Sequence, residues 1–88
     1  MKELELAGFI VRSSYRKKVF VLFNNPIRPS EIARKLGIRL THITRELREL
    51  KKKGLIECLN PKERIGRFYQ LTHKGKILKT AMRKKKLL

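Results

Sequence analysis

The stretch SEIARKLGIRLTHITRELRELKKKGLIE, residues 30–57, decides the fold. It opens with a helix-start signal at Ser30, and three apolar residues share one side of the short helix that follows. Gly37 then tolerates the left-handed conformation that is common just past a helix end. Thr41 is expected to cap a second helix over residues 41–53. A helix, a tight turn with glycine and a second helix form the helix-turn-helix pattern, here over about residues 30–53.

Apolar and charged residues lie on opposite sides of the second helix. At about 100° per residue, three leucines fall within about 60° of Ile43. Glu46 and Glu49 share a separate flank, where Glu49 can pair with Lys53 one turn later. An ordinary solvated helix mixes charges of both signs, so their separation suggests an anionic partner. A solvated face, with Lys51 to Lys53 compensating the helix dipole, explains this helix alone equally well. The side opposite Ile43 carries basic and hydroxyl residues: Thr41, Thr44, Arg45, Arg48 and Lys52.

The overall charge of the chain also suggests an anionic partner. The chain has 88 residues, with 24 Lys and Arg against 7 acids and a net charge of +17. This length predicts one domain, residues 1–88, with one modest core, so that function takes place on the surface. No apolar run approaches the roughly 18–20 residues that span a bilayer. The N-terminus also lacks the basic region of a signal peptide, so a cytoplasmic protein without a membrane partner is predicted.

The segment before the helix-turn-helix is less clear. Residues 4–11 are apolar but short, and they fit an edge strand or a loose helical turn equally well. Ser13 or Ser14 can cap a first helix that runs to about Phe23.

Strand signals follow the charged helix. LIECLN, residues 55–60, and RFYQLT, residues 67–72, are separated by a turn-rich loop at residues 61–66, which predicts a β-hairpin. The loop is basic, although surface loops are often polar simply because water surrounds them.

A last helix is expected over about residues 73–86, capped by Thr72. Its apolar face suits the core or a dimer seam, with a membrane-surface helix as an alternative. Phe20 and Val21 need cover from this helix, from the N-terminal segment or from another copy of the chain. Together with Met82, they favour an oligomer.

Signals for catalysis or metal binding are missing from the sequence. Its five glycines form no phosphate loop, and no carboxylate pair or nucleophile constellation is present, so no enzyme and no cofactor are predicted. Cys58 has no partner for an internal disulfide and is expected to be a small buried core residue. His42 and His73 are isolated, which argues against a metal site.

The order of these features resembles the winged helix-turn-helix of MarR-like and ArsR-like regulators, in particular short archaeal members. The likeness covers roughly residues 14–80. It implies a mainly α fold with a β-hairpin wing over about residues 55–72, a homodimer and double-stranded DNA as partner. Long flanking helices and paired cysteines are missing, so no small-molecule or metal effector is evident. The residues that carry the resemblance are Ala33, Gly37, Ile43, Leu50, Lys52, Lys53, Gly54, Leu55, Leu71, Thr72 and Gly75.

The resemblance implies a division of labour on DNA. Helix 41–53 would enter the major groove, and the wing loop, residues 60–67, would lie on the backbone or in the minor groove. We expect base contacts from the start of the helix, and phosphate contacts from its far end and the turn. The base-reading candidates are Thr41, His42, Thr44 and Arg45. The backbone candidates are Ser30, Arg39, Arg48 and Lys52, and the wing candidates are Lys62, Arg64 and Arg67. The core expected to hold the helix is Ile32, Leu36, Ile43, Leu47, Leu50, Tyr69 and Leu71.

Two other functions fit the same residues. A charge of +17 would serve any polyanion, so a sequence-indifferent DNA or RNA binder or a chromatin-type protein is one alternative. The other is a winged-helix module that docks an acidic protein partner.

Overall fold

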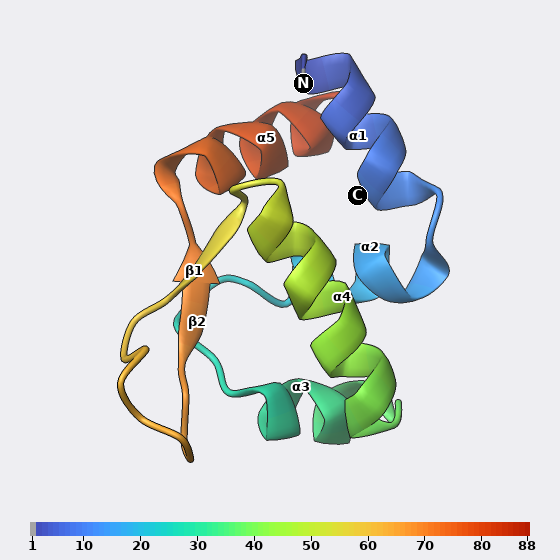
Figure 1. Ribbon diagram of the computed structural model, residues 1–88. Coiled ribbons are helices and arrows are strands. Elements are labelled where there is room, and N and C mark those ends of the chain that lie inside the picture. Colours follow the sequence, from blue (N-terminus) through green and yellow to red (C-terminus); the bar gives the residue numbers. More distant parts are fainter. Residues whose placement is uncertain (1) are drawn as a thin grey trace.

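Five helices and one antiparallel hairpin make up residues 2–88, the part of the chain that the computed structural model describes (Figure 1). This arrangement confirms the predicted α+β winged-helix class. The elements in chain order are α1 (Glu3–Val11), α2 (Ser14–Val21), α3 (Pro29–Leu36), α4 (Leu40–Lys52), β1 (Ile56–Cys58), β2 (Tyr69–Leu71) and α5 (His73–Lys84).

The N-terminal segment is a helix, which settles the choice that the sequence left open. Leu6 and Ile10, four residues apart, are both buried, and Ala7 and Phe9 widen the buried face. Figure 1 shows α1 crossing one end of α5 before the chain turns into α2. Tertiary packing on two neighbouring helices therefore selects the helix in a segment too short to form one alone.

Helix α2 begins where the sequence predicts. Most of its apolar side chains are covered by other segments of the same chain. The Ser13 side chain accepts a hydrogen bond from the Arg16 amide, which confirms Ser13 as the cap. Phe20 and Met82 are buried within the single chain, and only Val21 stays partly exposed, at 37 %. The prediction that these three residues favour an oligomer is therefore wrong for Phe20 and Met82.

The turn between α3 and α4 follows the helix-turn-helix pattern. Gly37 has φ 65°, and the Ile38 amide donates to the Ala33 carbonyl to close the end of α3. Helix α4 starts at Leu40, with Arg39 as its cap residue and no side-chain cap hydrogen bond. The prediction of Thr41 as the cap is wrong, because Arg39 holds the extended backbone and Thr41 already lies within the first turn.

The core holds α4 by one side. Ile43 and Leu50 are fully buried, and Leu47 is nearly so, which confirms the predicted stripe. Each such side chain contributes about 1.5–3 kcal/mol of burial free energy. Leu40 was assigned to this stripe but is 47 % exposed, because it stands at the first residue of the helix. Ile32 and Leu71 are also buried, as predicted, whereas Leu36, Tyr69 and Cys58 are half-buried at the edge of the core.

The hairpin is short and is extended by a third segment. Ile56 pairs with Leu71 and Cys58 with Tyr69. Ile27, in the linker before α3, joins Tyr69 through two backbone hydrogen bonds of 2.9 Å. The linker thereby ties the start of α3 to the root of the hairpin.

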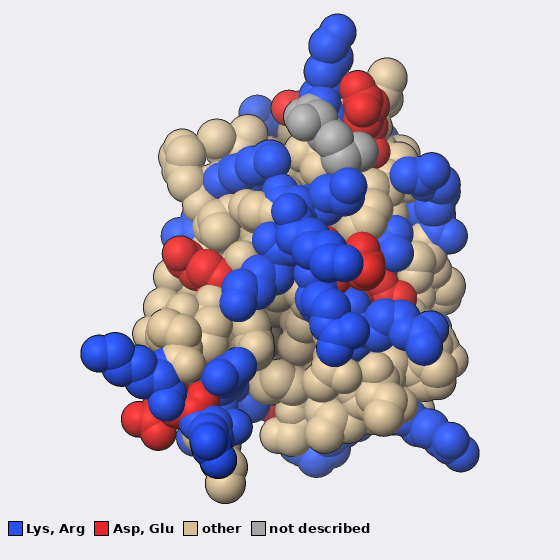
Figure 2. Space-filling model, in the orientation of Figure 1, with Lys and Arg blue, Asp and Glu red and all other residues tan. Residues whose placement is uncertain are grey.

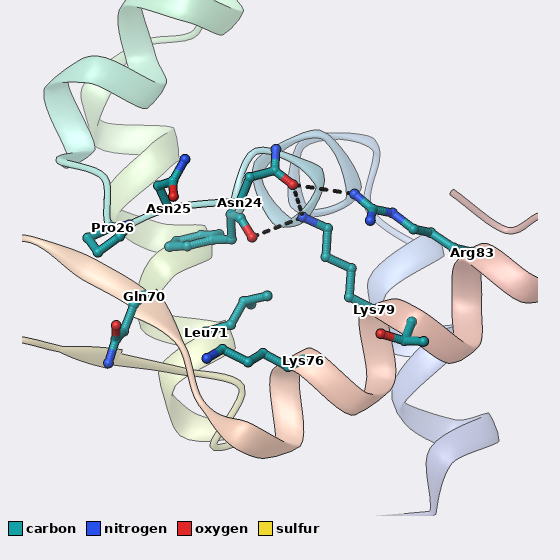
Figure 3. Close-up of a pocket in the computed structure, with 10 residues that line it drawn as sticks. Asn24, Asn25, Pro26, Gln70, Leu71, Lys76, Lys79 and Arg83 are labelled. Carbon is teal, nitrogen blue, oxygen red and sulfur yellow. Dashed lines mark hydrogen bonds between the residues drawn. The ribbon is translucent and has the colours of Figure 1, made fainter.

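Helix α5 is held at its start and at its middle. Thr72 accepts from the Gly75 amide, which confirms the predicted cap. Further along, the buried Lys79 ammonium donates to the Phe23 carbonyl at 2.9 Å and to Asn24 Oδ1 at 3.0 Å (Figure 3). It also donates to the Val21 carbonyl at 3.0 Å. Burial lowers the pKa of Lys79, and the nearby Arg83 charge lowers it further. Lys79 thus satisfies carbonyls at the C-terminal end of α2.

Candidate nucleic-acid interface

The basic side of α4 is open to solvent. Figure 2 shows Lys and Arg side chains gathered over α4 and over the hairpin loop. In residues 2–88, the side chains of Arg45 and Arg48 form no ion pair and no hydrogen bond. The exposed members of this side, called here the basic stripe, are Thr41, Thr44, Arg45, Arg48 and Lys52.

The two acids of α4 are kept away from the basic stripe. Glu46 is only 8 % exposed, and it accepts from Arg16 Nε at 3.0 Å and from Ser13 Oγ at 3.3 Å. Glu49 lies 3.8 Å from Lys52 rather than pairing with Lys53 as predicted, because the Lys53 ammonium sits over the Phe9 ring. Of the two acids, only Glu49 offsets a charge of the stripe, through a loose, exposed pair.

The bond between Glu46 and Arg16 predicts a stability difference between the two acids. Replacing Glu46 with Ala leaves the half-buried guanidinium without its carboxylate, so the free energy of unfolding should fall by about 2 kcal/mol. The matched change Glu49→Ala removes only an exposed pair and should cost less than about 0.5 kcal/mol. Urea unfolding of both variants measures this, and equal losses would contradict the assigned role of Glu46.

Helix α4, the start of α3 and the hairpin line a shared groove of about 260 Å³. The groove places Arg48 of α4 beside Arg67 of the hairpin, with Thr44 on the same wall. Lys51 also lines it, a residue that the sequence assigned only to dipole compensation at the helix end. The full lining is Pro29, Thr44, Leu47, Arg48, Lys51, Arg67 and Tyr69.

The base-reading candidates divide between two flanks. Thr41, Thr44 and Arg45 are exposed together near the start of α4. The Thr44 hydroxyl donates to the Thr41 carbonyl at 3.0 Å, which leaves its oxygen free to accept from a base amino group. His42 lies on a different flank, where its ring centroid is 5.3 Å from that of Tyr15 in α2.

Ser30 and Arg39 occupy the two helix starts of the motif. Ser30 is exposed in the first turn of α3, and Arg39 is exposed directly before α4. Backbone amides at helix starts carry partial positive charge, so both positions suit a phosphate oxygen.

The wing loop is shaped by its own side chains. Arg67 Nε donates to the Glu63 carbonyl at 2.6 Å, and its Nη2 donates to the Pro61 carbonyl at 3.3 Å. Lys62 and Arg64 are exposed, with no side-chain partner among residues 2–88. Arg67 therefore supports the loop, while Lys62 and Arg64 offer free charge.

Arg28 is a basic residue of this region that the sequence did not single out. Its guanidinium carbon lies 4.5 Å from the centroid of the Phe68 ring, at the root of the wing. The only sequence signal was its place before Pro29, at the start of α3. The structure identifies Arg28 because Phe68, 40 positions further along the sequence, packs against its guanidinium.

Residues 2–88 contain no group of three or more His, Cys, Asp or Glu side chains that could hold a metal ion. No helix among these residues has both the length and the apolar character needed to cross a membrane.

Comparisons with known proteins agree with this geometry. A family model for the Crp-like helix-turn-helix domain matches residues 3–72. YodB from Bacillus subtilis superposes with a TM-score of 0.78 at 19 % identity, covering 99 % of this chain and 89 % of that one. A homodimeric winged helix-turn-helix DNA-binding domain, Mb0332 from Mycobacterium bovis, gives 0.70 at 19 %, covering 91 % and 75 %. No curated protein matches the chain.

MarR from Escherichia coli is similar in sequence as well as fold. It has 27 % identity and a TM-score of 0.71 over 89 % of this chain, which spans 60 % of the MarR chain. These findings confirm the predicted resemblance, and such regulators are not enzymes. The chain belongs to the Crp-like helix-turn-helix domain family, and it is a DNA-binding transcriptional regulator.

Proposed function

We propose that the protein reads a specific duplex sequence with α4 in the major groove and residues 60–67 on the backbone or in the minor groove. One observation carries this assignment. The buried Ile43, Leu47 and Leu50 fix one side of α4, and the opposite side presents the basic stripe to solvent. An α-helix fits the major groove, and Arg side chains there can reach base edges.

Base reading is proposed for the first turns of α4. The Arg45 guanidinium can bind O6 and N7 of guanine together, which provides roughly 1–3 kcal/mol of discrimination. Thr41 and Thr44 supply hydroxyl oxygens to neighbouring bases. His42 reaches the groove only from the Tyr15 flank, so its contribution is expected to be smaller than that of Arg45.

Phosphate binding is proposed for the positions around this centre. With about six to ten phosphate contacts per bound unit, the logarithm of affinity should fall with the logarithm of salt with a slope of about −5 to −9. The residues proposed to contact phosphates are Ser30, Arg39, Arg48, Lys52, Lys62, Arg64 and Arg67.

A homodimer is proposed as the DNA-bound form. The similar domain Mb0332 is homodimeric. In this chain Leu4 of α1 is 76 % exposed and Ile77 of α5 is 51 % exposed, on two helices that pack together. A second copy covering these two side chains would present two recognition helices to a palindromic site.

Two single substitutions test the proposed roles. Arg45→Ala should relax base preference at one position of the site selected from random duplex DNA. Arg64→Ala should weaken binding to all duplexes alike and flatten the salt slope by about one. A palindromic consensus would support the dimer. If both changes lower affinity equally on every sequence, or if wild type selects no consensus, sequence-indifferent binding replaces the proposal.

A further inference from the structure

The tip of the wing carries an apolar side chain with no cover. Ile65 is 89 % exposed, the highest value among the exposed large hydrophobic residues of the described chain, ahead of Leu4 at 76 %. Single exposed apolar residues are common on protein surfaces. The position of Ile65 sets it apart, because it stands in the loop that the proposed function places on DNA.

The loop that presents Ile65 is held from inside. Asn60 Nδ2 donates to the Gly66 carbonyl at 3.1 Å, and Asn60 Oδ1 accepts from the Phe68 amide at 2.9 Å. Arg67 binds two further loop carbonyls, as described above. Gly66 has φ 73°, a turn conformation that brings the chain back toward β2. These contacts fix the backbone on both sides of the tip, so the exposed side chain is presented on a braced turn.

Ile65 itself suits insertion into a narrow site. A β-branched side chain has few rotamers, so burying it at an interface costs little conformational entropy. Burial would also remove almost its whole apolar surface from water, which no contact within residues 2–88 does.

Positive charge around the tip indicates an anionic partner. Arg64 is the immediate neighbour of Ile65, Lys62 stands three positions earlier, and Arg67 and Arg28 lie at the root of the loop. Glu63 is the only acid in the loop, so its environment is cationic. An apolar tip with a cationic rim matches the DNA minor groove, where two phosphate walls flank the edges of stacked bases.

We propose that Ile65 is an apolar wedge that enters the minor groove beside the α4 site and partly unstacks a pyrimidine–purine step. This inference rests on the proposed placement of the wing. Pyrimidine–purine steps unstack and kink more easily than A-tracts, so the wedge would favour sites with such a step at the wing position. The protein would then discriminate sequence at base pairs that α4 does not touch.

The experiment uses the full-length protein and two duplexes that share the selected major-groove site. One carries a TA step at the wing position and the other a stiff A-tract, each with 2-aminopurine at that step. Ile65→Ser removes the wedge without changing net charge, and Ile65→Leu retains an apolar tip. Val11→Ser, at a position 41 % exposed in α1, is the control away from the wing, and an unchanged mass of the free protein shows that it leaves any dimer intact.

Wild type and Ile65→Leu are expected to prefer the TA duplex and to raise 2-aminopurine emission on binding it. Ile65→Ser should bind the TA duplex about tenfold more weakly, with unchanged salt slope and no rise in emission. Val11→Ser should behave as wild type.

Three outcomes would overturn the wedge while leaving the proposed function standing. The first is unchanged affinity and emission with Ile65→Ser, and the second is an equal loss with Val11→Ser. The third is a change in the mass of the free Ile65→Ser protein without a change in emission, which would place Ile65 at a contact between copies. Failure of the wild type to bind either duplex at low salt would instead overturn the proposed function together with the wedge.

Discussion

Replacing Arg45 and Arg48 together with glutamate should abolish binding to the selected duplex at physiological salt, a loss of about a thousandfold or more. The double change removes two cations from the centre of the basic stripe and introduces two anions facing phosphate. Both side chains are exposed and unpaired within residues 2–88, so the fold should survive the change. Fluorescence anisotropy with labelled duplex measures the loss, and circular dichroism checks the helices.

Lys17→Glu with Lys18→Glu is the matched control for this double reversal. It lowers the net charge of +17 by the same four units. Both lysines are exposed on α2, the helix whose cap residue Ser13 and whose Arg16 bind Glu46 of α4. Binding should weaken by less than about tenfold, through the general field of the protein alone. Equal losses from the two double variants would show that charge matters and its position does not.

Gly75→Ala is expected to give the largest loss of stability, about 3 kcal/mol of unfolding free energy. A Cβ at Gly75 would overlap the carbonyl oxygen of Leu55 and would approach the Leu71 side chain to 3.2 Å. The Leu55 carbonyl accepts from the Thr72 amide, so it is not free to move aside. Such a loss is a large part of the 5–15 kcal/mol of a typical domain. Thermal and urea unfolding measure it.

Gly8→Ala tests whether close approach, rather than the loss of a helical glycine, causes that effect. Gly8 also lies within a helix, α1, but a Cβ there would meet nothing within 4 Å. Alanine should therefore stabilise the protein by about 0.5–1 kcal/mol, because it lowers the entropy of the unfolded chain. Destabilisation at both glycines would contradict the account of Gly75.

Elements defined by neighbouring residues could be read from the sequence. The Ser13 and Thr72 caps and the Gly37 turn depend on contacts within about five positions, and all three are confirmed. The basic stripe follows from the period of one helix, so its exposure could be predicted as well. The predicted cap at Thr41 failed by two positions, because several residues near a helix start can enter the first turn.

Distant partners explain what the sequence alone could not predict. Glu46 falls about 60° from Ile43 on the helical wheel, at the edge of the apolar stripe. Its partners Ser13 and Arg16 lie 33 and 30 positions earlier in the sequence. From the sequence, Lys79 looks like an ordinary solvated lysine. It is buried because α5 packs against the end of α2, where its partners lie 55–58 positions earlier. Ile65 likewise looks like an ordinary apolar residue of a hairpin.

The sequence by itself determined the helix-turn-helix, the hairpin and the separation of charge on α4, because each depends on the period and turn chemistry of a short segment. Tertiary structure alone decided that the N-terminal segment is a helix, that Phe20 and Met82 are covered within one chain, and that Ile65 is not. Burial depends on which distant segments meet, and local periodicity cannot specify those meetings. The charged side of α4 could therefore be assigned from sequence, whereas the apolar tip of the wing required the folded chain.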